Sequence, residues 1–210
     1  TKVVNRGKCD KVFINTSGIG RVKPQHAGIV KGNGIYPGDK VIINGTLGDH
    51  GIAVLAARES LHFETTVHSD CASLNQLISG LLGSFSEIRF MRDATRGGLA
   101  TVLCETTMHN DFGIRLDEAA LPVKEAVVGA CEIFGYDPLY VANEGKVVII
   151  ASAAEAPQII KKMKENPLGT DSAIIGEVVS DHPGKVVLET SIGGSRIVDM
   201  LAGEQLPRIC

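Results

Sequence analysis

One loop carries the strongest local signal for chemistry in this 210-residue chain. It reads Arg-Asp-Ala-Thr-Arg-Gly-Gly at residues 92–98, between a short apolar run and a segment of helical periodicity. Backbone N–H groups at the start of a helix bind anions, and Gly97 and Gly98 would let a phosphate approach them closely. Arg96 can add a bidentate phosphate contact, while Asp93 can hold Mg²⁺ or cap the helix. A capped surface turn explains the same residues equally well, so this loop alone leaves the choice open.

A second glycine-containing loop, at residues 45–51, also joins a strand-like run to a helical segment. Its sequence Gly-Thr-Leu-Gly-Asp-His-Gly lacks the Gly-Lys-Ser/Thr ending of a Walker A loop. His50 is a candidate for contact with phosphate or for proton transfer. The competing interpretation makes Asp49 the N-cap of the following helix and leaves His50 in its first turn without a function.

A polar triplet, Asn143-Glu144-Gly145, interrupts two apolar stretches at residues 139–142 and 146–150. Apolar neighbours raise the pKa of a carboxyl group, and a raised pKa suits a general base. Glu144 is therefore a candidate base. The alternative is a polar turn between two strands.

The chain ends in a thiol, Cys210. The Gly- and Pro-containing residues 201–210 would reach roughly 30 Å when extended, far enough to enter an active site of this protein or of a partner. Only a small fraction of an ordinary thiol is thiolate at neutral pH, so an incidental terminus remains the alternative. No CxxC spacing relates the other cysteines, at positions 9, 71, 104 and 131. This pattern predicts neither a disulfide framework nor a bound metal, and it is typical of a reduced cytoplasm.

The composition excludes several classes of function. With 44% hydrophobic and 21% charged residues, the chain is not intrinsically disordered. A net charge of −3 and an aromatic content of 4% without Trp provide no surface for nucleic acid. No apolar run reaches the roughly 20 residues that cross a bilayer. We therefore expect a cytoplasmic globular protein that binds neither nucleic acid nor membranes.

The elements that must position these residues alternate between strands and helices, which predicts an α/β or α+β domain. Strands are expected at residues 11–16, 39–44, 88–91, 113–116, 146–152, 173–179, 185–189 and 196–200. Helices are expected at residues 52–60, 72–82, 99–109, 124–134 and 154–165. The Gly- and Pro-rich residues 21–38 predict a loop or linker at a domain boundary.

Six segments, taken together and in order, resemble the HypE family of hydrogenase expression/formation proteins. These are carbamoyl dehydratases of the PurM-like (aminoimidazole ribonucleotide synthetase) superfamily. The segments lie at residues 1–4, 45–51, 92–99, 120–123, 142–146 and 206–210. The Pro-Arg-Ile-Cys ending is the most specific of them.

The resemblance implies a division of the chain. Residues 1–36 would be the last strands of an N-terminal ATP-binding domain and a linker, and 37–200 a PurM-like C-terminal domain with a mixed sheet packed by helices. Residues 201–210 would form a flexible tail. Family members extend further at the N-terminus, where an Asp-rich Mg-ATP site and most of a homodimer interface lie.

The resemblance also implies a reaction. A partner, HypF, would place a carbamoyl group on Cys210, and ATP-dependent dehydration would convert it to a thiocyanate. The cyano group would then pass to iron on a HypC–HypD scaffold, toward the [NiFe] centre of hydrogenase. Glu144 would be the base, and Lys2 would position the substrate or the γ-phosphate. The phosphate end of the site would include Asp93, Arg96, Gly97 and Gly98, with Asp49, His50 and Asn143 nearby.

Two alternatives remain. Selenophosphate synthetase and thiamine-monophosphate kinase share the fold and the use of ATP, but neither explains a terminal cysteine after Pro-Arg-Ile. The chain would otherwise be a non-catalytic carrier that presents Cys210, since the ATP-binding domain is absent from it. A chain that is carbamoylated without binding ATP would favour this second alternative.

Overall fold

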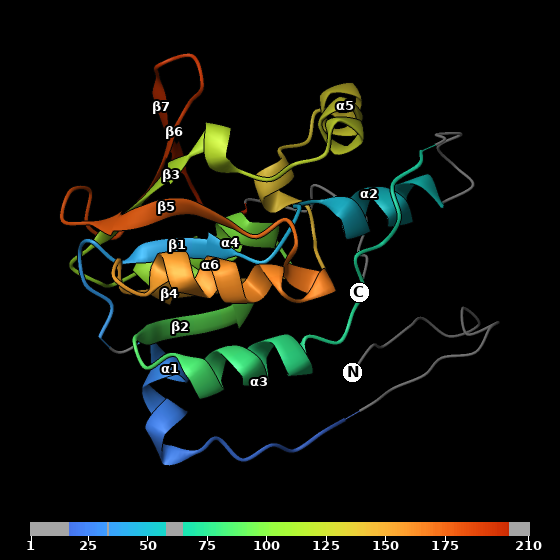
Figure 1. Cartoon of the computed structure of the whole chain (residues 1–210). Helices are drawn as coiled ribbons and strands as arrows, with labels where there is room; N and C mark the ends of the chain where they lie inside the picture. The colour runs from blue at the N-terminus through green and yellow to red at the C-terminus, as the bar shows by residue number, and fades with distance from the viewer. Residues whose placement is uncertain (1–16, 33, 58–64, 202–210) are drawn as a thin grey trace, which may run out of the picture.

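The computed structural model describes residues 17–32, 34–57 and 65–201 (Figure 1). The strand expected at residues 11–16 lies outside these ranges, as do Lys2 and Cys210.

A seven-stranded mixed sheet, in the order β2-β4-β1-β5-β3-β6-β7, organises the described residues. Its neighbouring strands run antiparallel except for β3 and β6, which are parallel. Strand β4, which lies between β2 and β1, has the sequence Val-Val-Ile-Ile-Ala and is buried at every position, as expected for a strand covered on both faces. The strands are β1 (Lys40–Ile43), β2 (Ile88–Asp93), β3 (Gly113–Asp117), β4 (Val147–Ala151), β5 (Ala173–Val179), β6 (Val186–Glu189) and β7 (Ser195–Val198).

Helices cover both faces of the sheet, and the period-two alternation of the strands divides the apolar side chains between two clusters. Helix α4 (Gly98–Thr107) packs on one face, against Val41 and Val148 among others. On the other face α3 (Asn75–Ser84) and α6 (Ala156–Lys164) pack against a cluster that includes Ile42 and Ile149. In Figure 1, α6 lies in front of β4 and α3 lies below β2, and the two helices contact each other.

A third, smaller cluster lies beyond the edge of the sheet. Here α2 (Asp49–Ala56) packs against α5 (Glu125–Phe134) through Ile52, Leu55 and Val127. The short 3₁₀ helices are η1 (Pro24–His26), η2 (Glu118–Ala120), η3 (Pro138–Tyr140) and η4 (Pro167–Gly169). Among the described residues, no helix is long and apolar enough to cross a membrane.

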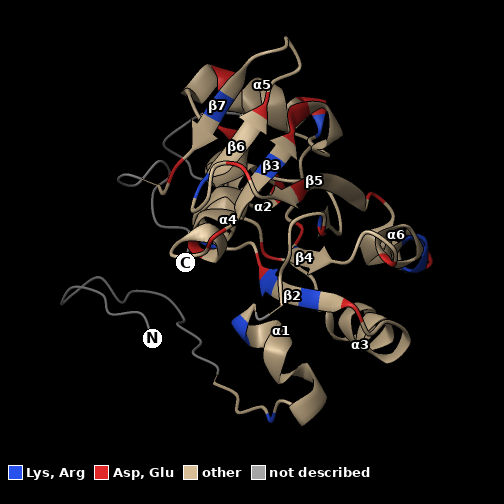
Figure 2. Cartoon of the chain, turned by 90° about the vertical axis from the view of Figure 1, so that its left-hand side faces the viewer, with Lys and Arg blue, Asp and Glu red and all other residues tan. Residues whose placement is uncertain are grey.

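On the face of the sheet opposite α4, strands β3 and β5 carry charged residues (Figure 2). Glu177 on β5 forms ion pairs with Lys40 on β1, at 2.6 Å, and with Arg115 on β3. Arg115 also reaches Glu189 on β6, at 3.6 Å. The pairs join four adjacent strands across the outer face of the sheet.

The structure confirms the α/β class and every strand expected within the described residues, with ends displaced by two residues at most. Helix α2 begins three residues before its expected start at residue 52, and α3 begins three residues after its expected start at residue 72. The prediction of a loop or linker at residues 21–38 is wrong in part. Pro24 starts η1, and α1 (Ala27–Lys31) follows and packs on β2 through Ile29.

Candidate functional site

The candidate residues meet at one edge of the sheet because of its antiparallel order. Strand β1 ends at Ile43 and β2 at Asp93, while the antiparallel strand β4 between them begins at Val147. The loops at residues 44–48, 93–97 and 142–146 are therefore neighbours, although they lie far apart in the sequence. The sequence prediction of one shared site is consistent with this placement.

The side chain of Asn143 joins these loops. Its Nδ2 donates to the carbonyl oxygens of Ala94, at 2.9 Å, and of Val141, at 3.1 Å. Its Oδ1 accepts from the backbone N–H of Gly48, at 2.8 Å, and the residue is fully buried. Both ends of the amide are thus bonded to backbone, so Asn143 positions the loops and is not placed to contact a nucleotide as expected.

A second buried amide, Asn44, fixes the other side of the same turn. Its Oδ1 accepts from the backbone N–H of Val147 at 2.8 Å. Its Nδ2 donates to the carbonyl oxygens of Gly145, at 3.2 Å, and Leu168, at 2.8 Å. Asn44 is the last residue of the strand expected at residues 39–44, and nothing in the sequence around it indicates a role.

Helix α4 begins at two glycines because the surrounding chain leaves no room for side chains. Gly97 is the N-cap with a φ of 72°, and Gly98 follows with a φ of 63°. A Cβ on Gly98 would lie 2.4 Å from the carbonyl oxygen of Leu139. Asp93 does not cap the helix, as one interpretation expected, but accepts a hydrogen bond from Thr95 Oγ1. The side chains of Asp93 and Arg96 are exposed at this edge, where a phosphate could reach them.

Glu144 lies beside an imidazole rather than in an apolar pocket. Its Oε1 is 3.8 Å from His50 Nε2, and its side chain is 29% exposed. The expectation of apolar neighbours is therefore wrong, because the apolar stretches on either side of the triplet point into the core. His50 lies in the first turn of α2, and its Nδ1 is 2.8 Å from Ser69 Oγ.

Asp49 is buried and does not act as an N-cap, since Gly48 occupies that position with a φ of 82°. Its Oδ2 accepts from Thr46 Oγ1 at 2.5 Å and from Lys124 Nζ at 2.9 Å. Asp49 therefore anchors the loop at residues 45–51 to Lys124, at the start of α5.

Asp70 is a site residue that sequence reasoning missed. Its Oδ1 accepts from the backbone N–H of Glu144 at 3.0 Å, and its carboxylate pairs with Lys146 Nζ at 2.8 Å. A Cβ on Gly145 would lie 2.0 Å from the Asp70 carbonyl oxygen, so the two segments are in close contact. Because 73 or more residues separate Asp70 from these partners and no motif surrounds it, the sequence offers no signal for the contact.

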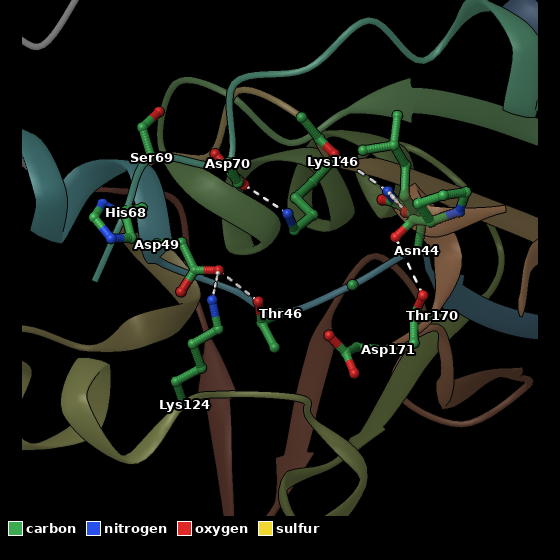
Figure 3. Close-up of a pocket in the computed structure, with 14 residues that line it drawn as sticks. Asn44, Thr46, Asp49, His68, Ser69, Asp70, Lys124, Lys146, Thr170 and Asp171 are labelled. Atoms are coloured by element: carbon green, nitrogen blue, oxygen red, sulfur yellow. Dashed lines mark hydrogen bonds and ion pairs between the residues drawn. The ribbon is translucent and has the colours of Figure 1, made fainter. Parts of the chain in front are cut away.

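A cavity of about 250 Å³ lies next to these contacts (Figure 3). Lys124 and Lys146 line it from two sides, but Asp49 neutralises the first lysine and Asp70 the second. Asp171 lines the cavity as well. The lining therefore offers hydrogen-bonding groups without an excess of positive charge, which is not the pattern of a phosphate pocket.

The described residues contain no group of three or more His, Cys, Asp or Glu side chains that could hold a metal ion. Asp93 therefore belongs to no such group within these described residues. Burial raises the pKa of the Cys104 and Cys131 thiols to about 11, which keeps them protonated and unreactive. Both are free cysteines of the core.

Comparison with known proteins identifies the relatives of this chain. Residues 36–189 match the family described as AIR synthase related protein, C-terminal domain. The chain is 50% identical, over its whole length, to the carbamoyl dehydratase HypE of Cupriavidus necator, and covers 59% of that protein. It is 45% identical to HypE of Escherichia coli K12, again over its whole length, and covers 61% of that protein.

Solved structures agree with these relatives. A hydrogenase maturation protein HypE superposes with a TM-score of 0.81 and 42% identity, over 86% of this chain and 58% of that one. A HypE in complex with ATP gives a TM-score of 0.79 and 41% identity, over 86% of this chain and 55% of that one. A HypE–HypF complex gives 0.74 and 47%, over 79% of this chain and 54% of that one. The chain spans about 60% of the curated relatives that it matches.

Proposed function

The chain belongs to the AIR synthase-related proteins and is a HypE homologue, and on that premise we propose that it serves [NiFe]-hydrogenase maturation. The proposed reaction is the ATP-dependent dehydration of a carbamoyl group on Cys210 to a thiocyanate, the source of an iron cyanide ligand. Because the chain spans about 60% of its relatives, we propose this activity for a protein of the relatives' full length.

Dehydration requires that the amide oxygen become a good leaving group and that a base remove the protons of the amide nitrogen. ATP supplies the phosphoryl group that makes this oxygen a good leaving group. The exposed Arg96 and the glycine-started helix α4 provide the phosphate end of the site. Glu144 is the base, because it is a partly exposed carboxylate at the same sheet edge, on a backbone fixed by Asn143 and Asp70.

The observation that carries this proposal is the meeting of Glu144 with the 45–51 and 92–98 loops at one edge, in a chain half identical to carbamoyl dehydratases. We propose the same division of the chain as the resemblance implies, at residues 36 and 200. Lys2 would position the substrate or the γ-phosphate, and the Mg²⁺ that accompanies ATP would bind largely in the N-terminal domain. The relatives' full-length form would be a homodimer.

HypF is the proposed donor of the carbamoyl group, and HypC–HypD the proposed acceptor of the cyano group. A HypE–HypF complex has been solved for a homologue that is 47% identical, which supports the first of these partners.

Mass spectrometry of the C-terminal peptide tests the reaction. The full-length protein is incubated with HypF, carbamoyl phosphate and Mg-ATP, with Cys210→Ala as the control. We expect Cys210 to gain a carbamoyl group and then to lose water, and Cys210→Ala to gain nothing. An adduct that persists in the presence of ATP would favour the non-catalytic carrier. No adduct at all would contradict the role of Cys210.

The role of Glu144 has its own test. Glu144→Gln should accept the carbamoyl group on Cys210 at the normal rate and fail to form thiocyanate. Normal thiocyanate formation by this variant would exclude Glu144 as the base.

A further inference from the structure

The proposed dehydration requires the base to take up two protons in one turnover. Converting R–S–C(=O)–NH₂ to R–S–C≡N removes both protons from the same nitrogen. The first leaves as the amide oxygen takes the phosphoryl group from ATP, giving R–S–C(=NH)–OPO₃²⁻ and ADP. The second leaves as the C–O bond breaks and phosphate departs with its electron pair. Glu144 can hold one proton, so it must release the first before it accepts the second.

We propose that His50 is the acceptor to which Glu144 passes that first proton, and that Ser69 and Asp70 are the positioning residues of the pair. This inference rests on the proposed function. His50 Nε2 lies 3.8 Å from Glu144 Oε1, and the His50 side chain is 14% exposed. A shortening of about 1 Å brings the two atoms within hydrogen-bonding range, a change that rotation of the Glu144 side chain can supply.

Ser69 sets the orientation of the imidazole. Its Oγ lies 2.8 Å from His50 Nδ1 and also accepts from the backbone N–H of Cys71 at 3.2 Å. With the His50 Nδ1–H donating to this oxygen, Nε2 carries the lone pair and faces Glu144. The serine thus directs the proton-accepting nitrogen at the carboxyl group.

Asp70, the next residue, sets the position of the base. Its Oδ1 accepts from the backbone N–H of Glu144, and its ion pair with Lys146 is enclosed, with side chains 5% and 9% exposed. Two consecutive residues therefore hold the two proton-transfer groups, one through the imidazole and the other through the backbone. A surface turn would need neither contact.

Each aspartate next to the Glu144–His50 pair has a lysine as its counter-charge, so neither adds a net charge beside the two proton-transfer groups. Asp70 is paired with Lys146 on one side, and Asp49, next to His50, is paired with Lys124 on the other. Transfer of a proton from the Glu144 carboxyl to Nε2 creates a carboxylate and an imidazolium in contact. Glu144 is then an acceptor again, and the imidazolium releases its proton to water between turnovers.

The test is a rapid-quench measurement of ADP and thiocyanate in the first turnover of the full-length protein, carbamoylated by HypF. In His50→Gln we expect ADP to form at close to the normal rate, while thiocyanate forms about 10–100-fold more slowly. In His50→Ala, added imidazole should restore thiocyanate formation in proportion to its concentration. His182→Gln is the matched control, because His182 is exposed in the turn after β5, at the opposite edge of the sheet, and should react normally.

Ser69→Ala provides a second variant that leaves the imidazole in place. We expect thiocyanate formation to slow while ADP formation stays normal, with a smaller effect than in His50→Gln. If His50→Gln forms thiocyanate at the normal rate, the inference is wrong and Glu144 acts without it. If ADP and thiocyanate fall together and imidazole restores neither, His50 is structural. Normal activity of Glu144→Gln would instead overturn the proposed base.

Discussion

Lys146 and Asp70 form an enclosed ion pair of 2.8 Å that ties the residue before β4 to a segment more than 70 positions earlier in the chain. The pair lies directly behind the backbone of Glu144, since the other oxygen of Asp70 accepts from the Glu144 N–H. The stability of this edge of the sheet and the proposed chemistry therefore depend on the same residues.

Removing one member of this pair should be costly. Asp70→Ala leaves the Lys146 ammonium buried without a counter-charge, so we expect a loss of about 3 kcal/mol in the free energy of unfolding. Urea denaturation measures this loss. Lys162→Ala is the control, because Lys162 pairs with Glu165 at the surface of α6 and its removal should leave the midpoint unchanged. Equal midpoints for the two variants would show that the Asp70–Lys146 pair contributes nothing.

Replacing the buried Asn143 amide with a carboxyl group should destabilise the protein. Asn143→Asp keeps the shape but cannot donate to the carbonyl oxygens of Ala94 and Val141, so we expect about 2–3 kcal/mol of destabilisation. Thermal unfolding is the measurement. Asn110→Asp removes one half-buried hydrogen bond, to Thr106, and should cost about 1 kcal/mol or less. A stable Asn143→Asp would mean that the loops do not depend on this amide.

Two glycine-to-alanine substitutions should have opposite effects. At Gly98 the new methyl group would lie 2.4 Å from the Leu139 carbonyl oxygen on a backbone with positive φ, so the helix start must distort. We expect a loss of more than about 2 kcal/mol there. At Gly129, inside α5, nothing lies within 4 Å, and alanine should add about 0.5–1 kcal/mol through its helix propensity. Thermal unfolding of both variants checks the difference in sign.

Glu177 makes the stability of the protein depend on pH in the acidic range. Its hydrogen bond from Lys40 lowers the pKa of the carboxyl group below the ordinary value of 4.5, and Arg115 adds to the effect. A lowered folded-state pKa means that the stabilisation is present above the unfolded pKa and is lost as the pH falls through the folded pKa. Glu177→Gln should therefore lower the melting temperature at pH 7 and have little effect near pH 2. A difference that persists undiminished in acid would contradict this interpretation.

The strands and helices follow closely from the sequence because their apolar periodicities are strong. The strand at residues 146–152 and the helix at 124–134, for example, lie within a residue of β4 and α5. The linker containing α1 was harder to predict, since a helix of five residues has too little periodicity to stand out and depends on the packing of Ile29.

The site was predictable only where glycines and charged residues cluster along the sequence. The loops containing Asp49, His50 and Gly97 could be recognised in this way. Asp70 and Asn44 could not, because their partners come from other strands and a single Asp or Asn carries no signal of its own. The environment of Glu144 was predicted wrongly, since the sequence shows which residues flank it but not that His50 lies across from it.

The four residues of the turn at 143–146 differ in how tightly their surroundings hold them. The amide of Asn143 is saturated, Gly145 has no space for a side chain and Lys146 is held by Asp70, which leaves Glu144 as the one partly exposed side chain of the four. A reactive group mounted on so rigid a support can adjust to its substrate only by rotating its own bonds. In the proposed reaction, alignment of the reacting atoms would then come mainly from the incoming carbamoyl group.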